Sequence, residues 1–485
     1  MWLFNSRSKT DSYDKTRKKL AVNNSIIKRI DRIGGGEMKR VITYGTFDLL
    51  HQGHINLLKR AKEYGDYLIV GVTTDSYDKY RGKLNVNDSI VKRIENIKKS
   101  GYADEIIIEE YEGQKVEDIQ KYNVDTFVIG SDWKGKFDYL KEFCEVVYLE
   151  RTKGISSTQI REDKNKILKI GIIGAGRIAE RFVIESKYVS GINIEGVMSR
   201  SIENSRKFAE KFELEFYTNN FEEFIKKVDA VYIATPHNTH YYYIKKSLEN
   251  KKHVLCEKPI TLSSKETNVL YKIAKENKLV LLEAIKTAFC PGFEKLINIA
   301  KSGIIGEIKD VEACFTKLVE GDIRELSHKE AGGSVTELAS YPLLGIVKLL
   351  GKPENVEFYS YFDKEKKIDL YTKILLKYQS GIIPVAKVGL GVKSEGELII
   401  SGTKGYIYVP SPWWKTEYFE LRFEDFAKNK KYFYPFQGEG LRYEIAEFLN
   451  MINQNKQETY KLKISEIKII NEIIEKFLIN RGKNG

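Results

Sequence analysis

The sequence predicts an α/β protein with two doubly wound parallel sheets and a further α+β region that contains an open, mainly antiparallel sheet. Between residues 40 and 149, short apolar β-rich runs alternate with helical patterns, and the same alternation starts again at residue 167. After residue 307, strand-like runs follow one another with few helical patterns between them. Alternation with helices is typical of parallel sheets, whereas successive strands are typical of antiparallel ones.

Composition excludes several classes of protein. The 42% hydrophobic and 12% aromatic content is that of a folded protein, and no run of eighteen apolar residues could cross a membrane. Only four apolar residues open the chain, which is too short for a signal peptide, so we expect a cytoplasmic protein. The four cysteines never form a C-x-x-C pair, so neither a zinc knuckle nor a redox pair is indicated.

The basic charge does not by itself indicate a nucleic-acid binder. The net charge is +12, and the excess is richest in residues 1–40, with 11 Lys or Arg against four Asp or Glu. Substrates that carry several phosphates also suit a basic protein. We therefore expect phosphorylated small molecules as partners, and keep nucleic-acid binding through the basic N-terminal arm as an alternative.

The N-terminal extension repeats part of the region that follows it. Sixteen of the 23 residues between 11 and 33 are identical to residues 75–97 at a constant offset of 64. The copy lacks both a preceding strand and an H-x-G-H turn, so it cannot build a nucleotide site. It is either a remnant of a duplication or an arm that competes with the genuine copy in a neighbouring subunit. Three glycines at 34–36 form a flexible link to the next domain.

The turn after the first predicted strand carries the first chemical motif. An apolar strand at 40–44 and a helical pattern at 55–64 flank the sequence G-T-F-D-L-L-H-Q-G-H. His51 and His54 stand at the helix start, where free N–H groups and the helix dipole favour a bound phosphate. Imidazoles can also donate to charge that builds on phosphorus. The pattern favours phosphoryl chemistry, although H-x-x-H alone could be a metal pair or two surface histidines. The further strands are expected at 67–72, 105–108, 126–129 and 146–149.

This motif resembles the G-T-F-D-x-x-H-x-G-H signature of the cytidylyltransferases, and the resemblance runs over residues 38–163. The glycerol-3-phosphate branch is the most similar, because G-S-D-W-K-G-K-F-D at 130–138 and R-T-K-G-I-S-S-T at 151–158 match in order. The resemblance implies that the two histidines stabilise the α-phosphate of CTP, with Mg²⁺, while a substrate phosphate attacks and pyrophosphate leaves. It assigns CTP binding to Gly45, Thr46, Phe47, Asp48, Arg81, Lys83, Arg93, Asp132, Arg151, Thr152, Ser156, Ser157 and Thr158.

Some of these assignments have a structural alternative. Arg81 and Lys83 occupy a loop where the branch has two lysines; Arg binds phosphate bidentately, so the role is kept, but a solvated face is the alternative. Arg93 fits the family arginine only after a one-residue insertion. Trp133, beside Asp132, either lines the substrate or base pocket or simply packs.

A second nucleotide motif follows a charged boundary at 161–166. A strand at 167–173 precedes G-A-G-R-I-A, whose glycines let a pyrophosphate approach the start of a helix. The next strand, at 192–198, ends in Ser199 and Arg200 and not in an acidic residue. Ser and Arg can bind a 2′-phosphate, which favours NADP over NAD, although Arg200 could instead stack on adenine.

The T-P-x-x-x-H sequence at 235–240 and E-K-P at 257–259 complete a resemblance to the glucose-fructose oxidoreductase and inositol dehydrogenase family, Gfo/Idh/MocA. The resemblance implies that Lys258 polarises the substrate oxygen beside the nicotinamide. The family's acid and Tyr would be Glu337 and Tyr341 on one helical face, with Tyr341 as proton donor or as a structural residue. Cofactor binding is assigned to Gly174, Gly176, Arg177, Ile178, Ser199, Arg200, Thr235, Pro236, His240, Glu257 and Lys258.

His237 and His240 could also suggest a metal, but their position at a strand end favours packing near the cofactor. Strand-like runs at 370–378, 381–388, 397–401 and 406–409 predict the open sheet, which in that family often forms a dimer interface, and closing helices begin after residue 438. We therefore expect a homo-oligomer. The predicted domains are an extension at 1–37, a cytidylyltransferase domain at 38–163, a Rossmann domain at 167–290 and an α+β domain at 291–485.

Together the two halves predict a bifunctional enzyme that makes a CDP-alditol from CTP, a polyol or sugar phosphate and NADPH. Reduction could come before or after cytidylyl transfer. The alternative is a working cytidylyltransferase that carries a non-catalytic, NADP-sensing regulatory domain.

Overall fold

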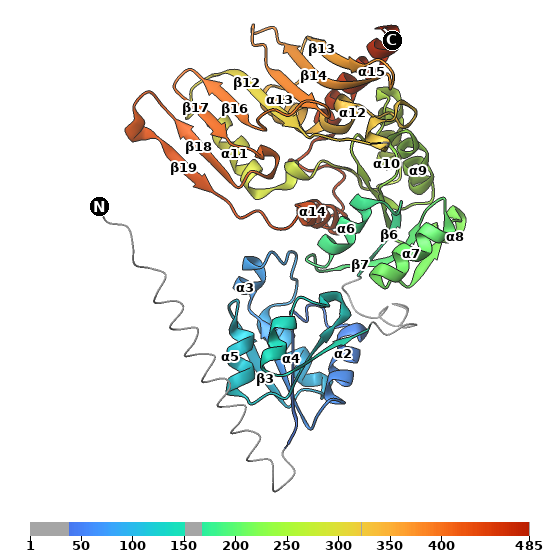
Figure 1. Cartoon of the computed structure of the whole chain (residues 1–485), viewed down its shortest axis with the longest axis vertical. Coiled ribbons are helices and arrows are strands. Elements are labelled where there is room, and N and C mark those ends of the chain that lie inside the picture. Colours follow the sequence, from blue (N-terminus) through green and yellow to red (C-terminus); the bar gives the residue numbers. More distant parts are fainter. Residues whose placement is uncertain (1–37, 151–166, 322, 485) are drawn as a thin grey trace. The chain divides into compact units, whose positions relative to one another are not determined.

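The computed structural model describes residues 38–150, 167–321 and 323–484 (Figure 1). The chain divides into two compact units, and each is described by itself. Of the described residues, the first unit contains 38–74 and 90–150, and the second contains 75–89 and those from 167 onward. Residues 75–89 therefore group with the second unit, although along the chain they lie inside the predicted cytidylyltransferase domain.

The first unit is built on a five-stranded parallel sheet in the order β3-β2-β1-β4-β5. Helices cover both faces, because the apolar residues of each strand are buried on both sides: Val41 packs with α2 and α4, whereas Ile42 packs with α5. The strands are β1 (Arg40–Gly45), β2 (Tyr67–Thr73), β3 (Glu105–Glu109), β4 (Thr126–Gly130) and β5 (Glu145–Leu149), and the helices are α2 (Gln52–Lys62), α4 (Ile90–Ser100) and α5 (Gln114–Lys121).

The second unit begins, after the short helix α3 (Asp75–Tyr80), with a six-stranded parallel sheet in the order β11-β10-β9-β6-β7-β8. Its strands are β6 (Leu168–Ile173), β7 (Ile192–Met198), β8 (Phe216–Thr218), β9 (Ala230–Ile233), β10 (His253–Glu257) and β11 (Leu281–Ala284). Its helices are α6 (Arg177–Ser186), α7 (Ile202–Phe212), α8 (Phe221–Ile225), α9 (His240–Glu249) and α10 (Ser264–Glu276).

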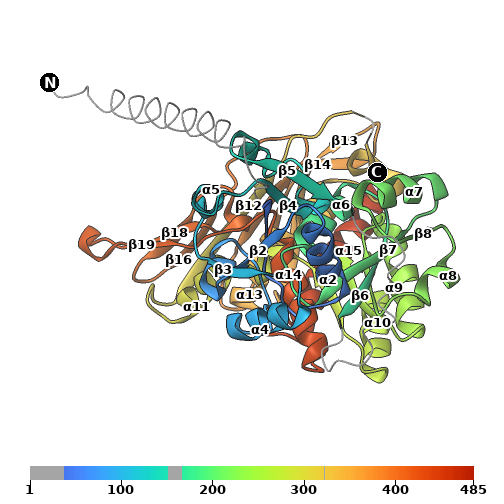
Figure 2. The ribbon, with the colours of Figure 1, turned by 90° about the horizontal axis from the view of Figure 1, so that it is seen from below.

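An eight-stranded sheet completes the second unit in the order β13-β14-β15-β12-β16-β17-β18-β19. One of its edge strands, β19, lies at the left of Figure 2. Its pairs are antiparallel except for β12 with β15. The strands are β12 (Ile308–Thr316), β13 (Asn355–Asp363), β14 (Ile368–Lys377), β15 (Val385–Gly389), β16 (Leu398–Gly402), β17 (Tyr406–Val409), β18 (Tyr418–Arg422) and β19 (Lys430–Phe433). The helices are α11 (Pro291–Lys301), α12 (Ser334–Leu338), α13 (Ser340–Leu350), α14 (Leu441–Asn453) and α15 (Ile464–Asn484).

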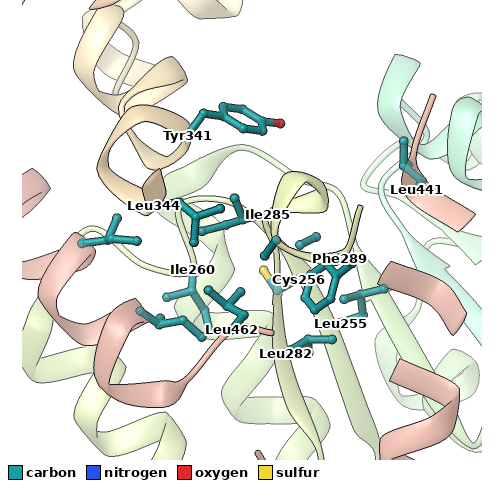
Figure 3. Packing of buried hydrophobic residues seen from close by; sticks show 14 of the residues in the cluster. Leu255, Cys256, Ile260, Leu282, Ile285, Phe289, Tyr341, Leu344, Leu441 and Leu462 are labelled. Atoms are coloured by element: carbon teal, nitrogen blue, oxygen red, sulfur yellow. The ribbon is translucent and has the colours of Figure 1, made fainter. Parts of the chain in front are cut away.

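One continuous core joins the two sheets of the second unit. Leu255 and Cys256 of β10 pack in the same cluster as Leu344 of α13 and Leu441 of α14 (Figure 3). Because these elements share one core, the end of β10 and the start of α13 hold a fixed relation within this unit.

The predicted fold class is confirmed, with local differences that have physical reasons. Helix α2 starts at Gln52, three residues before the predicted start, because the His51 side chain caps the helix there. This cap outweighs the low helix propensity of Gly53. The strand predicted at 381–388 starts only at Val385, after Pro384, which has no N–H to donate to a sheet. The single helix predicted for Glu337 and Tyr341 is interrupted at Ala339, because Pro342 cannot donate to the carbonyl of the preceding turn.

Candidate active sites

In the first unit, the two histidines of the turn after β1 lie face to face. The ring centroids of His51 and His54 are 3.8 Å apart and the planes are 22° from parallel. His51 caps α2, since its Nδ1 accepts from the Gly53 N–H at 3.1 Å. A Cβ on Gly53 would lie 3.0 Å from the His51 ring, so a larger residue would force the ring to shift. Both imidazoles thus stand at the N-terminus of a helix, where an anion is stabilised.

A left-handed backbone conformation at Phe47 and a buried arginine, Arg93, fix the chain around this turn. Phe47 has φ +52° and is buried, with its ring edge-on to His54 at 5.5 Å. Arg93 is fully buried and donates to the carbonyls of Thr46 and Thr73 at 2.8 and 2.9 Å. Through these two hydrogen bonds, Arg93 stabilises the backbone of the motif.

The position of the turn in the sheet also suits a nucleotide. In this sheet the order of strands reverses between β1 and β4, and ligands of doubly wound folds bind at such a switch point. Gly45 is the last residue of β1 and Asp48 follows it, and Asp132 and Trp133 lie in a 3-10 turn directly after β4. Trp133 contacts Phe137, with ring centroids 6.2 Å apart, and lies under the Lys136 ammonium at 4.7 Å.

A buried lysine at the same edge escaped the sequence reasoning. Lys115 forms an ion pair with Glu109 at the end of β3, and its Nζ lies 4.5 Å from the centroid of the Tyr44 ring. The Tyr44 hydroxyl donates to Asp118 at 2.8 Å, and burial together with this carboxylate raises the pKa of Tyr44. Lys115 shares a helical face with Ile119, four residues later, and this spacing was the available signal.

Two groups of predicted CTP-binding residues are not brought to this turn by the first unit. Arg81 and Lys83 lie in the segment that groups with the second unit. The remaining five lie outside the described residues: Arg151, Thr152, Ser156, Ser157 and Thr158.

In the second unit, the turn between β6 and α6 is shaped to receive a pyrophosphate. Gly174 has φ +108°, and a Cβ there would lie 2.5 Å from the carbonyl oxygen of Ala234. Gly176 precedes α6 in extended conformation, and the space where its side chain would stand is open. The two glycines leave an open space at the N-terminus of α6, next to the switch point between β6 and β9, and this space is here called the cradle. A Cβ would fill it, so the residues present fit the pyrophosphate of a dinucleotide.

Other predicted cofactor residues surround this cradle. Arg177 is exposed and pairs with Glu325 at 2.5 Å, and Ile178 packs on the core. After β7, the Ser199 hydroxyl donates to the Ser201 carbonyl at 2.8 Å, and Arg200 is exposed. No acidic side chain stands at the end of β7, so nothing there repels a 2′-phosphate.

The end of β10 and the start of α12 build a buried network of charges. The Lys258 ammonium donates to the Glu337 carbonyl at 2.7 Å. Both Glu337 carboxylate oxygens accept from Arg324, at 2.8 and 3.0 Å. His237 Nε2 lies 2.8 Å from Glu337 Oε1. Burial alone would raise the pKa of Glu337, but His237, Lys258 and Arg324 lower it more, so the carboxyl is ionised.

The histidines of the T-P-x-x-x-H motif are neutral parts of this region. Burial lowers the pKa of His237, which therefore donates one N–H to Glu337 and keeps its Nδ1 as an acceptor. That Nδ1 is buried without a hydrogen-bond partner in the described chain, so a ligand could donate to it. Burial also lowers the pKa of His240 to about 3, and its ring lies between the carbonyls of Pro259 and Thr235. No group of three or more potential metal ligands occurs among the described residues.

Tyr341 lies beside this network on the next helix. It is 9% exposed, and its ring centroid is 5.9 Å from Lys258 Nζ. Figure 3 shows its hydroxyl pointing away from the apolar cluster. Burial and the nearby Glu257 and Glu444 carboxyls raise the pKa of Tyr341, so the phenol keeps its proton. Glu257 itself accepts from the Tyr232 hydroxyl at 2.7 Å.

Lys258, Glu337 and Tyr341 are thus brought together, as expected, but Arg324 was not predicted. It lies in a 3-10 turn (Arg324–Leu326) between β12 and α12, thirteen residues before Glu337, and no sequence pattern marks it. Its partner, Glu337, is fixed on both oxygens, so this carboxylate orients neighbouring groups.

Comparison with known proteins decides the family of each part. Residues 42–163 match the description "Cytidylyltransferase-like". A glycerol-3-phosphate cytidylyltransferase from Bacillus spizizenii is 56% identical over 126 residues, which are 26% of this chain and 97% of that protein. Residues 168–284 match "Oxidoreductase family, NAD-binding Rossmann fold", and residues 293–408 match "GFO/IDH/MocA C-terminal domain". The chain joins a cytidylyltransferase-like domain to oxidoreductase domains of the Gfo/Idh/MocA family.

The oxidoreductase has more distant relatives. A trans-1,2-dihydrobenzene-1,2-diol dehydrogenase from Sus scrofa is 27% identical over 321 residues, 64% of this chain and 95% of that protein. The solved structure of a 3-ketoreductase from Actinomadura kijaniata, in complex with NADP and TDP-benzene, has a TM-score of 0.57 at 20% identity and covers 63% of this chain and 95% of that chain. At this identity the likeness shows the fold of the fused oxidoreductase. No helix in the described parts of the fusion is long and apolar enough to cross a membrane.

Proposed function

We propose that the fusion makes a CDP-alditol: the first half transfers CMP from CTP to a polyol or sugar phosphate, and the second half reduces a sugar carbonyl with NADPH. The observation that carries this proposal is that the oxidoreductase keeps a protonated Tyr341 beside Lys258, next to a cradle that fits a dinucleotide. A domain kept only to sense NADP would not need a proton donor and a cation at the substrate position.

In the transferase half, the stacked His51 and His54 rings would donate to the α-phosphate of CTP as a substrate phosphate attacks. Charge on the departing pyrophosphate needs further neutralisation. Lys83, Arg81 and Mg²⁺ bound with CTP would supply it. The 56% identity to a glycerol-3-phosphate cytidylyltransferase supports a small polyol phosphate as the acceptor.

In the oxidoreductase half, bound NADPH would supply a hydride to the carbonyl carbon. Lys258 is tethered by one N–H to the Glu337 carbonyl, so its remaining N–H groups can orient the substrate oxygen. Tyr341 would give its phenolic proton to that oxygen as negative charge develops. Arg324 and His237 fix Glu337, which keeps the lysine in place.

NADP is favoured over NAD because Ser199 and Arg200 follow β7, where an acidic residue would bind the ribose hydroxyls of NAD. A working cytidylyltransferase with an NADP-sensing regulatory domain is the second candidate, and the absence of any turnover of NADPH would favour it.

The first experiment measures NADPH oxidation with ketose and aldose phosphates from triose to hexose, each with and without CTP and Mg²⁺. Oxidation without CTP would mean that reduction comes first and would identify the sugar. Oxidation only with CTP would mean that a CDP-sugar is reduced. Pyrophosphate release without any oxidation would contradict the bifunctional proposal and support the regulatory one.

A further inference from the structure

The helix that carries Glu337 begins without a cap of its own. Gly333 precedes α12 with φ +123°, and it has no side chain that could accept from the free N–H groups at the start of the helix. The helix is only five residues long, so few hydrogen bonds of its own hold its first turn. Its position must therefore be fixed by other parts of the fold.

Asp369, near the start of β14, supplies the missing cap. Its Oδ2 accepts from the Val335 N–H at 2.9 Å, in the first turn of α12. The Ser334 hydroxyl donates to the Asp369 carbonyl at 2.9 Å and accepts from the Leu390 N–H at 3.0 Å. A Cβ on Gly333 would overlap Asp369 Oδ1, so the carboxylate occupies the space that another side chain would take. The start of α12 is thus bound to the eight-stranded sheet.

The same short helix connects Asp369 to Lys258. Two residues after Val335, the Glu337 carbonyl accepts from Lys258 Nζ at 2.7 Å. The partners of the Glu337 carboxylate hold only its side chain, whereas the ammonium is held by the main chain. The place of a main-chain carbonyl follows the backbone of the helix, so the cap at Val335 also determines where the ammonium lies.

The ionised carboxylate of Asp369 does not stabilise the fold. Asp369 is 0% exposed, and its Oδ1 has no hydrogen-bond partner among the described residues. Burial raises the pKa of Asp369 to about 6, although the Thr372 hydroxyl at 2.8 Å, the Val335 N–H and the Arg481 charge act in the opposite direction. A carboxyl with a raised pKa contributes stability below about pH 4 and loses that contribution as pH rises through 6. Above pH 6 the fold therefore carries a group that destabilises it, which is typical of a functional residue.

We propose that Asp369 is a positioning residue of the reductive site: as the cap of α12 it fixes the Glu337 carbonyl, and through this carbonyl it fixes the Lys258 ammonium. The inference rests on the proposed function of Lys258 in the reduction. Asp369 acts only through the helix, so its loss should lower kcat. Affinity for NADPH should not change, because the cradle at Gly174 lies in a different turn.

Three variants separate this role from a merely structural one. Asp369→Leu fills a similar volume but removes both carboxylate acceptors. Asp369→Asn keeps one oxygen that can accept from the Val335 N–H. Thr372→Val is the matched control, because it removes a different hydrogen bond to the same carboxylate and leaves the bond to α12 in place. A general loss of packing in this buried region would affect all three variants alike.

The probe is acetic anhydride, which acetylates accessible lysines, and the full chain is used. Loss of the cap frees Lys258 Nζ from its carbonyl, so Asp369→Leu should raise the rate of Lys258 acetylation by about tenfold relative to the exposed Lys265. Mass spectrometry measures both rates. Asp369→Asn and Thr372→Val should stay within about twofold of the wild type.

NADPH affinity and turnover complete the experiment. In all three variants the dissociation constant of NADPH should stay within about twofold of the wild type, which shows that the oxidoreductase is folded. With the sugar phosphate that the panel identifies, kcat should fall by about 10–100-fold in Asp369→Leu alone, at an unchanged KM for NADPH.

Acetylation of Lys258 at the wild-type rate in Asp369→Leu, or an unchanged kcat, would overturn the proposal. Equal effects in Thr372→Val would also overturn it, because they would follow from a general loss of packing. If Asp369→Leu binds no NADPH, Asp369→Ala takes its place, and loss of NADPH binding in both would show a role in folding alone. The expected acetylation rates, together with a wild type that oxidises no NADPH, would contradict the proposed function alone, since acetylation needs no turnover.

Discussion

In the first unit, His51 and His54 are held by a local turn, whereas in the second unit Lys258 and Glu337 are held by a buried network of charges. The turn needs only a cap, one glycine and a left-handed phenylalanine within ten residues. The network needs four groups, His237, Lys258, Arg324 and Glu337, that are far apart in the sequence and meet only after folding. We therefore expect substitutions in the local site to lower activity alone. Substitutions in the buried charged site should lower both activity and stability.

The largest effect is expected for Lys258→Ala. Loss of the ammonium removes the group that orients and stabilises the developing charge, so NADPH oxidation should fall by about 10³-fold. Pyrophosphate release should stay within twofold of the wild type. Parallel coupled assays on one preparation measure both rates, and loss of both in a folded variant would show that the two sites are not independent.

His54→Ala should produce the reverse. The remaining His51 cannot replace the second donor, so pyrophosphate release should fall by about 10²–10³-fold. NADPH oxidation should persist, and thermal unfolding should shift by no more than about 2 °C, because the N-cap of α2 is His51 and not His54. A large loss of stability would contradict the view that this site is purely local.

Sequence and structure agree best where the chemistry is contiguous. The G-T-F-D-L-L-H-Q-G-H turn, the Gly174 cradle and Lys258 lie in short motifs whose geometry is set by neighbouring residues. Arg324 and Lys115 were missed because their significance comes from partners brought near by the fold. The break between α12 and α13 has a different cause: a spacing of four residues predicts one helical face, but Pro342 has no N–H to continue the helix from α12.

In the buried region of the second unit, we expect a smaller effect, and it concerns the free energy of unfolding. Burial raises the pKa of Glu283 to about 8, well above its value of about 4.3 in an unfolded chain. A raised pKa stabilises the fold below pH 4 and loses that contribution as pH rises through 8.

Glu283→Gln keeps the oxygen that accepts from the Ile260 N–H at 2.8 Å but cannot ionise. The variant should therefore gain stability relative to the wild type by about 2–4 kcal/mol between pH 4 and pH 8. Denaturant unfolding at several pH values measures this difference. Parallel curves for the two proteins would mean that Glu283 is not buried in its neutral form.

The smallest effect is expected for Arg200→Ala. Arg200 is exposed at the end of β7, so its contact with a 2′-phosphate would be partly screened by solvent. The KM for NADPH should rise about fivefold, and the KM for NADH should not change. An equal rise for both cofactors would favour stacking on adenine instead.

The parallel pair of β12 and β15 has a consequence for the order of folding. It joins Glu312 to Val385, 73 residues further on, in a sheet whose other neighbours are antiparallel. Arg324, Glu337 and Tyr341 all lie on the connection between these two strands. Contacts of such long sequence separation form late, because the chain loses the entropy of a large loop before they are made. The charged network around Glu337 is therefore expected to form late in folding, after the more local turn at Gly174.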